Sequence, residues 1–195
     1  MSTRIRIRAE LAVAVAAALL FAAAASAKSG PQAELERVGA TAIVYRGPQV
    51  DVALSYRFAK NNPTGNWLLL ETVMTAARDP VDVTRGAIAV RTPDGEVVPL
   101  APQALLAEDY GSLASTIARA DVTREPLGYL TPRRFRPMRL FAQYGPGIAF
   151  PTVWLDQWHN DYGRLFFRLP DGVRKGNYEL LINLPEGKVV MPFAI

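Results

Sequence analysis

The sequence contains no cysteine and only one histidine, His159, among its 195 residues. Without cysteine the chain has no disulfide, no thiolate metal ligand and no thiol nucleophile, so its stability has to come from an ordinary apolar core. A single histidine also excludes the sets of two or three histidines that most catalytic zinc sites use. Histidine-dependent chemistry would therefore depend on His159 alone.

Catalytic sequence motifs are missing as well. The chain has no Gly-x-Ser-x-Gly elbow, no glycine-rich phosphate loop and no dinucleotide fingerprint. Acidic residues such as Glu71, Glu108 and Asp109 could form a carboxylate pair for glycoside hydrolysis, but sequence spacing does not establish the separation that this chemistry needs. The sequence indicates no cofactor, and we expect a protein that is not an enzyme.

The first 27 residues have the layout of a secretory signal peptide. A basic start is followed by an apolar run from Leu11 to Ala25 and by the small residues Ala25, Ser26 and Ala27. The apolar run is shorter than the roughly 20 residues that a membrane-spanning helix needs. We therefore expect cleavage after Ala27, a periplasmic or extracellular location and no transmembrane span in the mature chain; a retained anchor is the alternative.

Composition places the rest of the chain among globular proteins. Half of the residues are hydrophobic, which argues against disorder. Cleavage would remove three arginines and one glutamate and lower the formal charge from +4 to +2, so nucleic acid is not an expected partner. We predict a flexible leader at residues 28–39 and a single domain at residues 40–195.

Most of this domain has the pattern of β-strands separated by turns. Residues 50–58 alternate between apolar and polar side chains, and residues 67–76 form a second long apolar strand after the turn sequence NNPTGN. An Asp-Gly turn at residues 94–95 indicates a hairpin between residues 86–92 and 96–100. Further strands are predicted in the C-terminal half, at residues 138–143, 152–155, 163–169, 176–184 and 188–195.

Only one segment departs from this pattern. Residues 101–120 carry apolar side chains at helical spacing, divided near Gly111 and Ser112, so two short helices are predicted there. Residues 121–137 are rich in proline and arginine and are predicted to form an irregular loop. The fold class is therefore all-β, with the antiparallel strands arranged as a β-sandwich that carries a small helical insertion.

The C-terminal run LFFRLPDGVRKGNYELLINLPEGKVVMPFAI resembles the final strands of immunoglobulin-like domains in exported bacterial proteins. In those domains a glycine precedes a strand with an inward-facing aromatic residue, and Gly176 and Tyr178 match these positions. The run from WLLLETVMTA to IAVRTPDGEVVPLA is also similar to exported bacterial proteins without an assigned activity. The resemblance implies an immunoglobulin-like β-sandwich and transfers no catalytic residue.

The strongest candidate binding feature is a cluster of four arginines, Arg133, Arg134, Arg136 and Arg139. Arginine forks bind phosphate and carboxylate groups bidentately, which suggests docking of an anionic envelope polymer or lipid, or of an acidic patch on an envelope protein. The alternative is a solvated loop whose arginines pair with the protein's own acids. Trp158 is the tryptophan expected to be partly exposed, while Trp67 and Trp154 are expected in the core.

A second candidate lies in the segment DQWHND. Asp156, His159 and Asp161 are weak candidates for a metal site, or for the catalytic groups of a hydrolase acting on cell-wall material. The simpler interpretation is a turn between two strands. The preferred function is a non-catalytic binding or assembly module of the bacterial cell envelope, with strand-edge pairing between identical chains as a further alternative.

Overall fold

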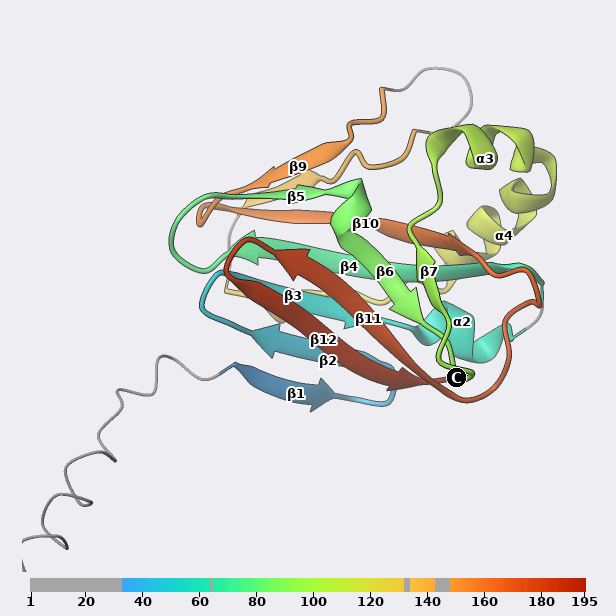
Figure 1. The fold of residues 1–195 in the computed structure, drawn as a ribbon, viewed down its shortest axis with the longest axis horizontal. Coiled ribbons are helices and arrows are strands. Elements are labelled where there is room, and N and C mark those ends of the chain that lie inside the picture. Colours follow the sequence, from blue (N-terminus) through green and yellow to red (C-terminus); the bar gives the residue numbers. More distant parts are fainter. Residues whose placement is uncertain (1–32, 64, 132–133, 143–147) are drawn as a thin grey trace, which may run out of the picture. The chain divides into compact units, whose positions relative to one another are not determined.

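Two β-sheets stacked face to face form most of the computed structural model, which describes residues 33–63, 65–131, 134–142 and 148–195 (Figure 1). The predicted signal peptide at residues 1–27 and the candidate Arg133 lie outside the described residues. Residues 33–195 make up one compact unit. The protein is therefore mostly β-structure, as predicted.

The first sheet has the strand order β1-β2-β3-β4-β10-β8. Its strands are β1 (Glu34–Val38), β2 (Ala42–Arg46), β3 (Val50–Ser55), β4 (Trp67–Ala76), β10 (His159–Arg168) and β8 (Arg134–Pro137). The second sheet has the order β12-β11-β6-β7 and contains β12 (Gly187–Ala194), β11 (Asn177–Leu184), β6 (Ile88–Arg91) and β7 (Val97–Pro99). A separate pair joins β5 (Val81–Thr84) to β9 (Thr152–Leu155).

The hairpin predicted at the Asp-Gly turn is present. Arg91 pairs with Val97 across the turn that contains Gly95, whose φ of 87° requires the left-handed conformation that glycine adopts easily. Leu184 pairs with Gly187 in the closing hairpin of β11 and β12. Strands β4 and β9 have the predicted bounds.

The core lies between the two sheets and takes side chains from both. Its largest fully buried members include Tyr178, Phe193, Leu54, Met74 and Phe167. The Tyr178 ring stacks on Phe193, and its hydroxyl accepts the backbone N–H of Arg174 and donates to the carbonyl of the same residue. Burial raises the pKa of Tyr178, so the hydroxyl stays protonated and able to donate. The expected inward orientation of Tyr178 is confirmed.

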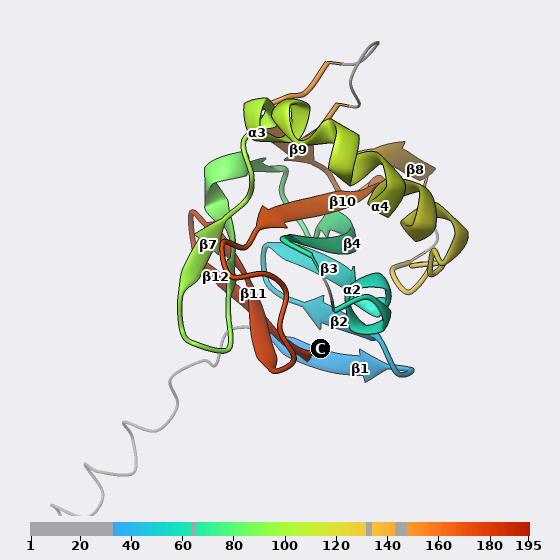
Figure 2. The same ribbon diagram turned by 90° about the vertical axis from the view of Figure 1, so that its right-hand side faces the viewer.

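Strand β4 is buried along both faces because the first sheet is covered on its outer side too. The helices α3 (Gln103–Glu108) and α4 (Tyr110–Val122) lie over β10 on that side (Figure 2). They form a second apolar cluster in which Leu106 and Leu113 pack with Leu69 and Phe166 of the sheet. This double coverage explains why seven of the ten residues of β4 are apolar and do not alternate with polar ones.

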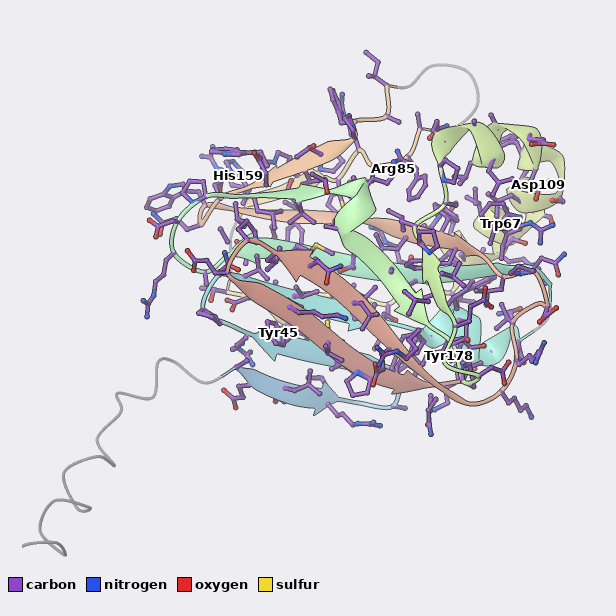
Figure 3. The ribbon with its side chains drawn as sticks, viewed as in Figure 1. Tyr45, Trp67, Arg85, Asp109, His159 and Tyr178 are labelled. Atoms are coloured by element: carbon purple, nitrogen blue, oxygen red, sulfur yellow. The ribbon has the colours of Figure 1, made fainter. Side chains whose placement is uncertain are left out.

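The helical insertion has the predicted two helices, although they meet at Asp109 and not at Gly111 and Ser112. Trp67 donates its indole N–H to Asp109 at 3.2 Å, which ties this junction to the start of β4 (Figure 3). No helix within the described residues is both long and apolar enough to cross a membrane.

Several predicted boundaries are wrong. Residues 34–38 belong to the predicted flexible leader but form β1, which pairs with β2; its side chains are mostly exposed, so its sequence is polar. Residues 57 and 58 were expected to extend β3 but begin the short helix α2 (Arg57–Asn61), which buries Phe58 on the outer side of the sheet. In both places tertiary contacts outweigh the local pattern.

The segment around the arginines also differs from the prediction. Of the predicted strand at residues 138–143, the structure describes residues 138–142, and these do not form a strand; instead β8 lies within the segment predicted to be irregular. It runs parallel to β10, so the expectation of a fully antiparallel sheet is wrong at this pairing. Strand β10 begins earlier than predicted, at His159, because β8 provides the partner for its first residues. Backbone pairing does not need apolar side chains, which is why the proline and arginine content concealed this edge strand.

Candidate functional site

The arginine cluster does not form a single anion site, because Arg136 points inward. The parallel register places Arg136 directly beside Asp161, a carboxylate that is 2% exposed. The Arg136 Nε and Nη2 atoms each donate to Asp161 at 2.7 Å, and Nη2 also donates to the carbonyl of Trp154 at 2.8 Å. The third guanidinium nitrogen of Arg136, Nη1, lies 3.5 Å from the Oδ2 atom of Asp156. Arg136 is therefore a structural counter-ion and not the docking residue that the sequence suggested.

Hydrogen bonding to Asp161 raises the pKa of Arg136 and outweighs the opposing effect of burial. The guanidinium thus stays charged wherever Asp161 is ionised. Arg134 and Arg139 are different, since both are exposed and neither forms an ion pair with another described residue. Of the predicted cluster, these two residues are the ones whose position suits an external anion.

Asp156 organises the turn that leads into β10. Its carboxylate accepts the backbone N–H groups of Trp158 at 2.7 Å and His159 at 2.8 Å, and it lies 2.8 Å from the His159 Nδ1 atom (Figure 3). Burial alone would raise the pKa of Asp156, but the bonds from the His159 ring and from these two N–H groups together outweigh it and lower the pKa.

This geometry is that of a turn closed by an aspartate. The pairing orients the His159 ring as a catalytic base would need, yet no serine or threonine hydroxyl among the described residues is hydrogen-bonded to it. Within the same residues no group of three histidine or acidic side chains could hold a metal ion. The guanidinium of Arg136 supplies the positive charge that Asp156 and Asp161 require.

The lowered pKa of Asp156 gives a test of the turn. A carboxylate with a depressed folded-state pKa stabilises the fold above its unfolded-state pKa, and this contribution disappears as the pH falls through the folded-state value. We expect Asp156→Asn to be less stable than the wild type at pH 7. The gap should begin to shrink below about pH 4, where the carboxylate of the unfolded chain takes up a proton, and it should close as the pH falls through the lower pKa of the folded state. Urea denaturation between pH 7 and pH 2.5 measures this difference, and a gap that is constant with pH would contradict it.

Exposed apolar side chains gather around β9. Among the described residues, nine large hydrophobic side chains are exposed, and five of them come from positions 135–158. These five are Phe135 at 55%, Ile148 at 68%, Phe150 at 45%, Trp154 at 53% and Trp158 at 69%. The expectation that Trp158 is exposed is confirmed, whereas the placement of Trp154 in the core is wrong.

Trp154 is exposed because β9 belongs to the small β5–β9 pair and has no covering layer on its outer face. Along this strand Val153 and Leu155 are buried and Trp154 points outward, as strand alternation requires. The same alternation in the run FPTVWL places Phe150 and Trp154 on one side. That signal was present in the sequence but does not identify which face meets the core.

We call the residues Ile148, Phe150, Trp154, Trp158, Arg134 and Arg139 the aromatic–arginine ridge. Ile148 and Phe150 precede β9, Trp154 lies on it and Trp158 follows it, while Arg134 lies on β8 and Arg139 follows β8. The backbone N–H of Phe150 donates to the carbonyl of Arg139 at 2.7 Å, and Arg136 lies over the Trp154 ring at 5.8 Å. The positive charge of the ridge comes from the exposed Arg134 and Arg139. One negative charge lies nearby, because the exposed Asp82 is paired with Trp154 across the β5–β9 ladder.

No known protein family, curated protein or solved structure matches this chain.

Proposed function

We propose that this protein is an exported, non-catalytic binding module that attaches to an anionic surface of the bacterial envelope through the aromatic–arginine ridge. The observation that carries the proposal is that four of the nine exposed large hydrophobic side chains of the described residues lie on β9 or within four residues of it, next to two exposed arginines. A water-exposed protein surface rarely groups aromatic residues without an interaction partner.

The chemistry of the ridge favours a lipid surface as the partner. Tryptophan prefers the boundary between water and lipid, where its ring contacts acyl chains and its N–H reaches polar groups. Arginine adds contacts to lipid phosphates, and each basic side chain near an anionic bilayer contributes about 1 kcal/mol. This proposal narrows the anionic envelope partner expected from the sequence to an anionic lipid bilayer.

Vesicle binding tests the proposal. The chain from Lys28 onward, which retains the compact unit of residues 33–195, should bind vesicles that contain phosphatidylglycerol more tightly than vesicles of phosphatidylcholine alone. The double variants Trp154→Ala/Trp158→Ala and Arg134→Ala/Arg139→Ala should each bind about tenfold more weakly. Raised salt should weaken wild-type binding, and it should weaken binding of the arginine variant less.

Matched controls come from other exposed positions. Val97→Ala/Val190→Ala removes exposed apolar side chains from the second sheet, and Arg57→Ala/Arg119→Ala removes two exposed arginines from helices. Both controls should bind like the wild type. Equal binding by ridge variants and controls, or no binding to either kind of vesicle, would remove the lipid surface as the partner and leave an acidic envelope polymer or protein to be tested.

We also infer that the two-sheet domain is related to the immunoglobulin-like sandwiches that its C-terminal run resembles. The support is the hydrogen bonding of the Tyr178 hydroxyl to Arg174, four residues upstream, which has the form of the tyrosine corner found in such domains. The six-stranded sheet and the parallel β8 pairing are additions to that plan.

The alternative function, a hydrolase that uses His159 with Asp156 or Asp161, has the Asp156–His159 hydrogen bond in its favour. The same carboxylate closes the turn through two backbone N–H groups, and Asp161 is paired with Arg136. These structural roles account for all three residues. We therefore favour the binding module.

A further inference from the structure

A cavity of about 870 Å³ lies between the outer face of the first sheet and the helical insertion. Protein interiors rarely leave voids much larger than one water molecule, whose share of liquid volume is about 30 Å³. Pockets that bind small molecules range from about 300 to 1,000 Å³. The volume of this cavity, which is partly open to solvent, lies within the range of ligand pockets.

Three parts of the fold build its walls. The sheet contributes the cross-strand pair Val73 and Tyr162 and the side chain of Phe166. Leu113 and Ile117 on α4 form the opposite wall. The segment after β8 closes a third side with three further lining residues, Met138, Phe141 and Ala142. Most of the lining is aliphatic or aromatic, so the body of a ligand held there has to be apolar.

Hydrogen bonds fix two of these walls relative to each other. The Gln103 side chain at the start of α3 donates to the carbonyl of Ala142 at 2.9 Å and accepts the N–H of the same residue at 3.0 Å. Arg85 donates to the carbonyls of Ala101 and Leu140 and lies over the Phe141 ring (Figure 3). The wall after β8 and the beginning of the helical insertion are thus held in fixed positions beside the cavity.

One side of the cavity is polar. Its charged lining residues are Glu71, Asp121, Arg124, Glu125 and Arg164. Arg164 forms ion pairs with Glu71 at 3.2 Å and with Asp121 at 2.6 Å. Arg124 is half exposed, stacks over Tyr162 and approaches Glu71 only to 4.0 Å, so most of its donors remain available.

The third carboxylate of this group, Glu125, has no arginine or lysine within ion-pair distance among the described residues. It is held instead by the hydroxyls of Thr41 at 2.9 Å, Ser55 at 2.7 Å and Tyr129 at 3.3 Å. Burial raises the pKa of Tyr129, and the negative charge of Glu125 and the hydrogen bond to it raise this pKa further. Three carboxylates therefore face two guanidiniums, and an acidic ligand would be repelled from this side of the cavity.

We propose that the cavity binds an amphiphile with an apolar body and an uncharged, hydrogen-bonding polar end. The apolar body occupies the space between Phe166, Met138 and Ile117. The polar end lies at the charged side, where hydroxyl or amide oxygens accept hydrogen bonds from Arg124 and hydroxyl protons are donated to the carboxylates. This site is separate from the aromatic–arginine ridge and does not depend on the function proposed for it.

The test uses the neutral apolar fluorophore N-phenyl-1-naphthylamine, measured without vesicles so that membrane docking plays no part. The probe should gain fluorescence with the wild type, and 1-monolauroylglycerol should displace it at about tenfold lower concentration than laurate at pH 7. Ile117→Trp fills the cavity from α4 and should weaken probe binding by about tenfold or more. Val122→Trp adds the same side chain to the exposed end of the same helix and should leave binding unchanged.

A second variant that fills the cavity keeps the test valid if Ile117→Trp does not fold. Ala107→Trp enters the cavity from α3, at a position that is exposed in the wild type and so tolerates a larger side chain more easily. Thermal unfolding followed by circular dichroism establishes which variants are folded. Probe binding that survives in a folded Ile117→Trp or Ala107→Trp variant would overturn the site, and stronger displacement by laurate would overturn the assignment of the polar end.

Discussion

Replacing Arg136 by alanine is expected to lower the free energy of unfolding by about 3 kcal/mol, the lower end of the cost of removing one partner from a buried ion pair, because the Arg136 side chain is 34% exposed. Asp161 is 2% exposed, and its two carboxylate oxygens both accept from Arg136 at 2.7 Å. Asp156 would lose a counter-ion at the same time. Without the guanidinium, one buried carboxylate has to stay charged without compensation or take up a proton.

Arg134 provides the matched control because it lies on the same strand but is exposed. Arg134→Ala should change the free energy of unfolding by no more than about 0.5 kcal/mol. Arg136→Lys should be intermediate, since an ammonium keeps the charge but not the two parallel hydrogen bonds. Urea denaturation monitored by tryptophan fluorescence gives these values. Similar losses for Arg134→Ala and Arg136→Ala would show that Arg136 does not act as the counter-ion of Asp161.

Replacing Arg164 by alanine is expected to cost about 3 kcal/mol for a related reason. Arg164 stands directly opposite Glu71 in the β4–β10 ladder, and the side chain of Glu71 is only 9% exposed. Arg164 also reaches Asp121, near the end of α4, so it ties the helix to the sheet. Its removal should destabilise the fold and loosen the last turn of α4 over the cavity.

Two further variants separate these effects. Arg124→Ala removes a half-exposed partner 4.0 Å from Glu71 and should cost less than about 1 kcal/mol. The double variant Glu71→Leu/Arg164→Met removes both charges and should recover most of the lost stability. Amide hydrogen exchange should remain faster at residues 119–122 in both Arg164 variants, because each lacks the bond to Asp121. Failure of the double variant to recover stability would contradict the ion-pair explanation.

These expected results divide the arginines of this protein into two groups: those that form internal ion pairs and those that stay exposed. The sequence shows a run of arginines next to aromatic residues, which looks like one positively charged surface. In the structure Arg136 and Arg164 are the central cations of two carboxylate networks, and each lies beside an aspartate or glutamate on a neighbouring strand. Arg134 and Arg139 remain outside. A count of arginines therefore overstates the charge that an external partner would meet.

The candidate residues around His159 also show that the sequence alone does not reveal which cation neutralises an acidic residue. Asp156, His159 and Asp161 are close in the sequence, which made a metal site conceivable. Asp156 and Asp161 both contact Arg136, which is 20 or more positions earlier in the chain. Sequence spacing within one segment carries no information on a cation that another strand supplies.

The sequence by itself determined the β-rich class, the hairpin at the Asp-Gly turn and the pair of short helices, whereas the inward position of Tyr178 was implied by the resemblance of the C-terminal run. These features depend on local rules, namely strand and helix periodicity and the backbone freedom of an Asp-Gly turn. The exposure of Trp158 could be predicted in the same way, because it lies in a turn between two strands.

Tertiary structure alone decided the pairing of β8 with β10, the exposure of Trp154 and the cavity under the helical insertion. Each depends on which segments meet across many positions of the chain. A strand pattern shows that two faces exist, but it does not show which face another layer covers. The cavity requires the outer face of a sheet, two helices and the segment after β8 to come together, with Gln103 and Arg85 joining the start of the helices to that segment, and no local pattern encodes this arrangement.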